Sequence, residues 1–294
     1  MHKLVPFLLM LSGATKAAEY PLLPLIPEDT GSVVGFDAGR MMSSHFGKRI
    51  LEKMQAADPR LKMLLNLGLD PKDVRQVMIA SGGASKSSLI LVNGAFPSRQ
   101  LLQGLAAGFL TDSAKKTVYD GIEMLGGSDG NAIAFADDHT LLVGHNMMIR
   151  GAIDRRKMRN KNAALLDRAG RWMNSHDLWF ASSGPTNDFT GRVGEQATGG
   201  ALNEGVLRAL GRTYGGLRFS DSLEVGVETM AKTDGDASSM VKMMRLLSAL
   251  SILTKGATSG LGFLDSLDIK AEANVVSFSL KVPRAAFDAM HPAE

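Results

Sequence analysis

Two clusters bring methionine close to histidine, and these side chains are the first candidates for chemistry. Met41-Met42 precede His45, and His145 precedes Met147-Met148. Thioether and imidazole groups are ligands that suit Cu(I). Methionine is also a flexible filler of protein cores, and the 17 methionines of this chain fit that use better. We therefore expect no metal site.

Two further motifs have the spacing of known catalytic or binding loops. Ser113-Ala114-Lys115-Lys116 matches the Ser-x-x-Lys spacing of acyl-enzyme hydrolases, but neither Ser-Asp-Asn nor Lys-Thr-Gly occurs to complete such a site. Gly82-Gly83 and Gly126-Gly127 resemble phosphate-binding loops in composition. Because neither pair is followed by Gly-Lys-Ser/Thr, we interpret both as hairpin turns. We expect no catalytic residue and no cofactor from these motifs.

Acidic and polar residues in loops supply the remaining candidates. Asp137-Asp138-His139 has the groups of a metal site, but acidic residues are common at tight hairpins for local reasons. Residues 182–200 form a long stretch rich in Gly, Ser, Thr and Asn, and long loops in compact domains are usually functional or disordered. We expect this loop to be the main binding surface. Its candidate residues are Asn187, Asp188, Arg192 and Glu195.

The absence of cysteine excludes several kinds of chemistry at once. A chain without cysteine has no disulfides, no thiolate nucleophile, no iron–sulfur cluster and no cysteine-bound zinc. Stability must come from apolar burial, which a 45% hydrophobic composition can supply.

The N-terminus has the three parts of an export signal. Met1-His2-Lys3 is positive, residues 4–11 are apolar, and Thr15 and Ala17 fit a small-residue cleavage pattern. The apolar run is too short to span a bilayer, which takes about 20 residues. We predict a signal peptide at 1–17, a Pro-rich segment at 18–31 and a secreted or periplasmic protein with no transmembrane span in its mature chain. The alternative is a buried N-terminal helix of a cytosolic protein.

Charge gives no indication of a nucleic-acid partner. Cleavage after residue 17 takes Lys3 and Lys16 from the 33 basic residues and leaves all 30 acidic ones, so the mature net charge is about +1. No block of lysine and arginine offers a surface for phosphate backbones.

The predicted helices and strands follow one another in a similar order twice. Residues 32–156 and 177–294 each give the order β-α-β-β-α-β-β-α, and a helix within 157–176 connects them. Short hairpins join most strands, with turns at 82–86, 120–121, 137–138, 221–222 and 274. Hairpins favour antiparallel pairing over a doubly wound parallel sheet. The sequence therefore predicts an α+β fold with two tandem helix-backed, mainly antiparallel sheets and an internal repeat. The basic stretch 154–161 is interpreted as a connection.

Several segments carry a resemblance that covers most of the mature chain. They are residues 23–30 and 33–37 at its start, the strands at 77–81 and 89–92, residues 143–145 with 152–154, and residues 215–219. Together they resemble a family of uncharacterised acidobacterial exported proteins, related to bacterial families of unknown function. The resemblance implies no activity. His145 departs from the pattern, because an acidic residue is usual there, so His145 or Asn146 must cap the helix that follows.

Taken together, these patterns favour a non-catalytic binding or interaction protein of the cell envelope, whose partner is an unknown protein or envelope ligand. The alternative is an envelope hydrolase whose site is assembled from residues far apart in the sequence. A third reading, association with a membrane surface through the Met/Leu-rich stretch 240–253, is disfavoured because its polar face is narrow and weakly basic.

Overall fold

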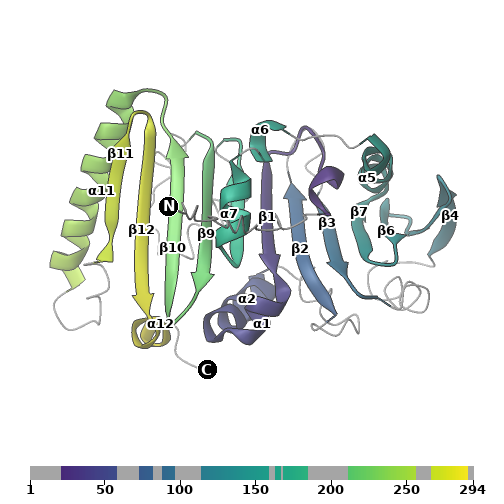
Figure 1. The fold of residues 1–294 in the computed structure, drawn as a ribbon, viewed down its shortest axis with the longest axis horizontal. Helices are drawn as coiled ribbons and strands as arrows, with labels where there is room; N and C mark the ends of the chain where they lie inside the picture. Colours follow the sequence, from purple (N-terminus) through teal and green to yellow (C-terminus); the bar gives the residue numbers. More distant parts are fainter. Residues whose placement is uncertain are drawn as a thin grey trace, which may run out of the picture.

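One antiparallel sheet of twelve strands runs along the whole molecule (Figure 1). The computed structural model describes residues 21–57, 73–81, 88–96, 114–158, 163–166, 168–184, 211–255 and 266–290. Across the sheet the strands lie in the order β11-β12-β10-β9-β8-β1-β2-β3-β7-β6-β5-β4. Their bounds are β1 Ser32–Asp37, β2 Val74–Ser81, β3 Ser88–Gly94, β4 Lys115–Tyr119, β5 Ile122–Gly126, β6 Asn131–Asp137, β7 Thr140–His145, β8 Leu178–Ser182, β9 Thr213–Phe219, β10 Ser222–Met230, β11 Asp268–Glu272 and β12 Val275–Pro283.

Helices cover both faces of this sheet. They are the short 3-10 helix η1 Leu23–Leu25, α1 Ala38–Ser43, α2 His45–Ala57, α5 Asn146–Met158, α6 Ala163–Leu166, α7 Ala169–Ser175, α11 Asp234–Lys255 and α12 Arg284–Met290. Side chains alternate between the two faces of a strand, so core contacts assign each helix to a face. Helices η1, α5, α6 and α7 share a core with Val33 and Trp179, whereas α1 and α2 pack with Phe36 and Leu178. Helices α11 and α12 pack on alternate residues of β12, from Val276 to Val282.

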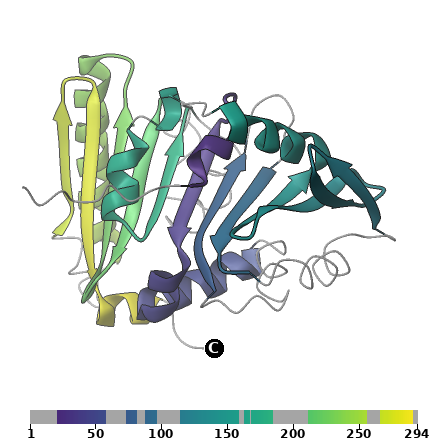
Figure 2. The same cartoon turned by 45° about the vertical axis from the view of Figure 1, so that its right-hand side comes forward.

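The α+β class is therefore confirmed, but the two predicted sheets form one. Strand β1 pairs with β2 on one side and with β8 on the other, so the two halves meet in the middle of the sheet. An unpaired β1 or β8 would expose a row of backbone donors and acceptors, and their mutual pairing removes both edges. Counted outward from this pair, the order of strands in the sheet is β1, β2, β3, β7, β6 on one side and β8, β9, β10, β12, β11 on the other. The β4–β5 hairpin is added beyond β6 (Figure 2).

The hairpin predictions agree with the strand pairing. Strands β4–β5, β6–β7, β9–β10 and β11–β12 pair antiparallel around the expected turns. Strands β2 and β3 also pair antiparallel, and their predicted turn at 82–86 lies outside the described residues. Asp120 and Gly121 have φ angles of 52° and 77°, the left-handed values that a two-residue hairpin turn requires.

Two predictions between the halves are wrong. The single connecting helix is two short helices, α6 and α7, and the basic stretch interpreted as a connection is helical as far as Met158. Bonds from its basic side chains hold the end of α5 in place, since Arg155 donates to the Leu25 carbonyl and Arg156 pairs with Asp137.

The Pro-rich segment is part of the core. Leu22, Leu25 and Ile26 are buried against α5, and Arg155 donates from Nε and Nη2 to the Leu25 carbonyl oxygen over 3.1 and 2.8 Å. Residues 21–31 therefore belong to the folded unit.

Candidate functional site

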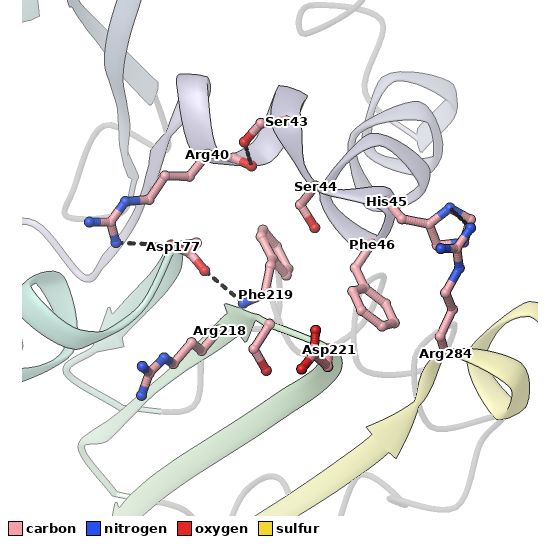
Figure 3. A pocket seen from close by; sticks show the side chains of 11 residues that line it. Arg40, Ser43, Ser44, His45, Phe46, Asp177, Arg218, Phe219, Asp221 and Arg284 are labelled. Carbon is pink, nitrogen blue, oxygen red and sulfur yellow. Dashed lines mark hydrogen bonds and ion pairs between the residues drawn. The ribbon is translucent and has the colours of Figure 1, made fainter.

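An open pocket of about 620 Å³ lies at the ends of the central strands, where residues of the two halves of the chain meet (Figure 3). The first half contributes the α1–α2 connection, and the second contributes the start of β8, the β9–β10 turn and the first residue of α12. The lining residues are Arg40, Ser43, Ser44, His45, Phe46, Asp177, Arg218, Phe219, Ser220, Asp221 and Arg284.

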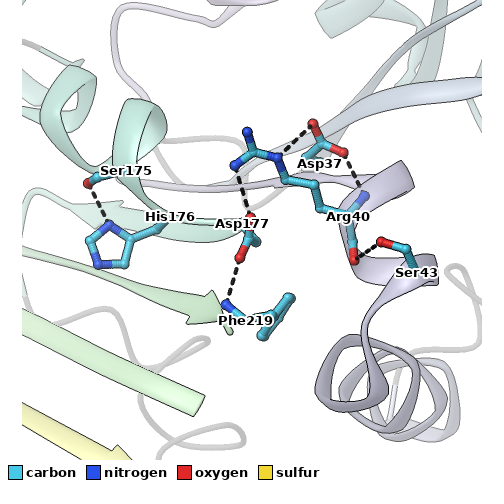
Figure 4. Close-up of polar contacts among 7 residues, drawn as sticks. All are labelled: Asp37, Arg40, Ser43, Ser175, His176, Asp177 and Phe219. Carbon is cyan, nitrogen blue, oxygen red and sulfur yellow. Dashed lines mark hydrogen bonds and ion pairs between the residues drawn. The ribbon is translucent and has the colours of Figure 1, made fainter. Parts of the chain in front are cut away.

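Asp177 connects three segments at one wall of this pocket (Figure 4). Its side chain is 7% exposed; Oδ1 accepts from Arg40 Nη1 at 3.1 Å and Oδ2 from the Phe219 amide at 2.6 Å. Asp37 caps α1, because its Oδ1 accepts from the Arg40 amide at 2.9 Å. The largely exposed Arg40 side chain thus lies between two carboxylates, 3.1 Å from Asp177 Oδ1 and 4.0 Å from Asp37 Oδ2.

His45 forms the opposite side of the pocket with helix α12. Its Nε2 lies 2.6 Å from Asp288 Oδ1, and Arg284 Nη2 lies 3.3 Å from its Nδ1. An arginine always donates, so Nδ1 accepts and the Nε2 proton goes to Asp288. The hydrogen bond from His45 lowers the pKa of Asp288 below its usual value. Phe46 and Phe287 meet edge to face at 5.1 Å and join the same two helices.

The serines of the pocket do not form a nucleophile with this histidine. Ser43 Oγ donates to the Arg40 carbonyl, and Ser44 Oγ accepts from the Gly47 amide at the start of α2. Both ring nitrogens of His45 already contact Asp288 and Arg284. A serine nucleophile needs a base within hydrogen-bond reach, and the described residues provide no such pair here.

A second serine–histidine contact lies near the pocket, at the end of α7. Ser175 Oγ is 2.8 Å from His176 Nδ1 but gives its own proton to the Arg171 carbonyl at 2.7 Å, so the histidine donates to the hydroxyl. The His176 ring packs on Trp172 at 4.6 Å, and burial lowers its pKa. This arrangement positions α7 on the sheet and does not activate the serine.

The two methionine–histidine clusters do not form metal sites among the described residues. Met41 is fully buried in the core, and His45 pairs with Asp288 instead. At the second cluster His145 Nδ1 accepts from the Met147 amide at 3.4 Å, which places His145 as the expected cap of α5, while Met147 is 69% exposed. No group of three His, Asp or Glu side chains that could hold a metal ion occurs in the part of the chain that the structure describes.

The remaining candidates have local roles or lie outside the described residues. Asp137 accepts from the His139 amide and pairs with Arg156, and His139 Nδ1 contacts the Gly94 carbonyl. Gly126 and Gly127 belong to the β5–β6 hairpin, as expected. Lys116 pairs with Glu123 on β4–β5, whereas Ser113 and Gly82-Gly83 are not described. The predicted binding loop with Asn187, Asp188, Arg192 and Glu195 also lies outside the described residues.

Sequence reasoning missed most of the pocket. Arg40, Arg218 and Arg284 stand alone in the sequence, and no motif surrounds them. Of the lining residues, only His45 was a candidate, and for a different role. One usable signal is the Ser43-Ser44 break between two helical stretches, which exposes the start of α2.

Comparisons with known proteins give a fold and no family. No family model and no curated protein matches the chain. Among solved structures, crystal form I of TP0453 is similar with a TM-score of 0.55 and 15% identity, over 93% of this chain and 96% of that chain. Crystal form III of TP0453 gives a TM-score of 0.54 and 13% identity, over 91% and 96%. At this identity the likeness extends to the fold alone. None of the described helices is both long and apolar enough to cross a membrane.

Proposed function

We propose that this chain is an exported protein of the cell envelope that binds a ligand or partner and does not catalyse a reaction. The observation that carries the proposal is the open pocket between the two halves, whose volume lies in the range of ligand sites, about 300–1,000 Å³. Its hydroxyls and its histidine are engaged in local contacts, which favours binding over the alternative of an envelope hydrolase.

Ligand binding and hydrolysis can be separated with one matched pair of variants. Ser43 and Ser175 are both exposed, and each hydroxyl bonds a carbonyl of its own helix, but only Ser43 lines the pocket. Ser43→Trp should fill the pocket and abolish ligand-induced thermal stabilisation, and Ser175→Trp should leave it intact. Turnover of fluorogenic esters or peptides by the wild type, lost in Ser43→Trp, would establish the hydrolase instead.

Export is a second part of the proposal, supported by the residue pattern at 1–17. Expression of the full chain in a bacterial host followed by N-terminal sequencing should give a protein in the envelope fraction that begins at Ala18. A variant lacking residues 2–17 should remain in the cytoplasm. An unprocessed wild-type chain in the cytoplasm would contradict export.

We further propose that residues 32–156 and 177–294 derive from a duplication and that the chain belongs with the exported acidobacterial proteins that it resembles. The duplication is supported by the order of strands in the sheet, which is the same on the two sides of the β1–β8 pair apart from the added β4–β5 hairpin. Alignments of relatives give the test: profiles built separately on the two halves should match each other, and profiles that never do so would speak against a common origin.

A further inference from the structure

The pocket presents one basic and one acidic side chain on either side of a strand end. Figure 3 shows the guanidinium of Arg218 extending away from the end of β9 on one side, and the carboxylate of Asp221 on the other. We propose that the ligand is a zwitterion, a molecule with a free carboxylate and a free ammonium group, long enough to reach both sides of this strand end, as a short peptide is. This inference rests on the proposed binding function.

Arg218 and Asp221 are the charged side chains of the pocket that have no partner among the described residues. Arg40 is bound by Asp177 at 3.1 Å, and Arg284 lies 3.7 Å from Asp288 and 3.3 Å from His45. Arg218 and Asp221 are both exposed, and neither side chain forms an ion pair or hydrogen bond with another described residue. A carboxylate on Arg218 and an ammonium on Asp221 would complete the charge pairing of the pocket.

Aromatic rings supply the apolar part of the site. Phe46 is buried and Phe219 is half-buried, and both line the pocket between the α1–α2 connection and the β9–β10 turn. Because Arg218 and Phe219 are consecutive in β9, the Arg218 side chain lies on the opposite face of the strand from these rings. Ligand sites typically combine such apolar walls with a few placed polar groups. A purely anionic ligand fits less well, because Asp221 would repel it, and a purely cationic ligand would meet Arg218.

Calorimetric titration of the mature protein with tri-L-alanine and with L-alanine tests the inference. Charge-assisted hydrogen bonds are worth about 1.5–3 kcal/mol, which corresponds to about a tenfold to hundredfold change in affinity. N-acetyl-tri-L-alanine should lose this factor because it lacks the ammonium group, and tri-L-alanine amide should lose it because it lacks the carboxylate. The relative affinities of tri-L-alanine and L-alanine distinguish a peptide from a free amino acid.

Two conservative variants assign each end of the ligand. Arg218→Gln should weaken binding of tri-L-alanine about tenfold to hundredfold and leave tri-L-alanine amide unaffected. Asp221→Asn, which removes the partner of the ammonium group, should also weaken binding of tri-L-alanine about tenfold to hundredfold and leave binding of N-acetyl-tri-L-alanine unaffected. Equal affinity for capped and free peptides, or wild-type binding by both variants, overturns the assignment.

Inorganic phosphate and maltose serve as probes of other ligand classes. If either one binds and Ser43→Trp abolishes that binding while neither alanine probe binds, the zwitterion is wrong and the binding function stands. If none of the four probes binds, the zwitterion assignment is also wrong. Hydrolysis of the peptide would contradict the binding function itself.

Discussion

At the scale of single residues, glycines determine how closely α7 approaches the sheet. A Cβ at Gly216 would lie 2.6 Å from His176 Cγ, and one at Gly226 would lie 2.9 Å from Trp172. The side chains of Trp172 in α7 and of His176 directly after it therefore rest on the backbone of β10 and β9. The sequence marks these glycines only as weak strand residues, because the helix that needs them lies elsewhere in the chain.

Gly216→Ala should destabilise the protein by about 1–3 kcal/mol, because the new methyl group must displace the half-buried His176 ring. Urea unfolding followed by circular dichroism measures the change. Gly170→Ala is the matched control: no atom lies within 4 Å of its Cβ, and alanine favours the helix, so stability should stay the same or rise by up to about 1 kcal/mol. Equal effects at the two positions would contradict the close approach.

The same histidine predicts a pH dependence of stability. Burial lowers the pKa of His176 below 6.5, so the unfolded chain takes up a proton at a pH where the native state does not. The free energy of unfolding should therefore fall as the pH drops from about 7 through 6.5, a window set by the ordinary pKa of histidine.

Urea titrations at pH 7.5 and 5.5 check this dependence. His176→Gln should reduce the difference in unfolding free energy between the two pH values, whereas His139→Gln, which removes an imidazole bonded to the Gly94 carbonyl, should retain it. A difference that persists unchanged in His176→Gln would show that another group is responsible.

The pocket could be predicted from the sequence only in part, because its contacts join distant residues. Arg40 and Asp177 are separated by 137 positions, and His45 and Asp288 by 243. Local patterns identify a cap or a turn, as they did at His145 and at Asp120-Gly121. They carry no information about which charged residues of the two halves come together.

At the scale of elements, the N-terminal segment shows how composition misleads. Three prolines within residues 21–27 suggest a stiff spacer, yet Leu22, Leu25 and Ile26 between them are buried. Arg155 satisfies the Leu25 carbonyl, a backbone group that a buried turn would otherwise leave without a partner. The basic composition at the end of α5 likewise suggests a connection, yet its arginines bond the backbone and side chains of other elements.

Ile26→Ala should therefore cost about 2–5 kcal/mol, the usual price of an emptied core position. Leu23→Ala, at a half-buried position of the same segment, should cost clearly less. Both values come from urea midpoints measured with a common slope. If neither substitution changes stability, the segment is not part of the folded unit.

At the scale of the whole molecule, the pairing of β1 with β8 decides that there is one sheet. Turn signals reveal which neighbouring strands form hairpins, and this is why those predictions agree with the structure. The β1–β8 pair joins strands from different halves, and no turn connects them. Its only trace in the sequence is Gly35 opposite Trp179, where a Cβ would lie 2.5 Å from the indole ring.

A continuous sheet should unfold as one cooperative unit, and the fluorescence of the two tryptophans can be used to follow its unfolding. Trp179 packs against Gly35 of β1 and reports the junction of the halves, whereas Trp172 packs against Gly226 of β10 within the second half and shares a core with Trp179. Ile133→Val in β6 and Ile269→Val in β11 remove one buried methyl group from opposite halves, each at a cost of about 0.5–1.5 kcal/mol.

The core around Val33 and Trp179 contains residues of both halves. Each variant should therefore shift the tryptophan transition and the circular dichroism transition by the same amount, with an unchanged urea slope. Two independent halves would give another result. Circular dichroism would then become biphasic, and at least one variant would leave the fluorescence midpoint where it is in the wild type. Coincident shifts in both variants would place the pocket within a single cooperative folding unit, which its ligand could stabilise but not assemble.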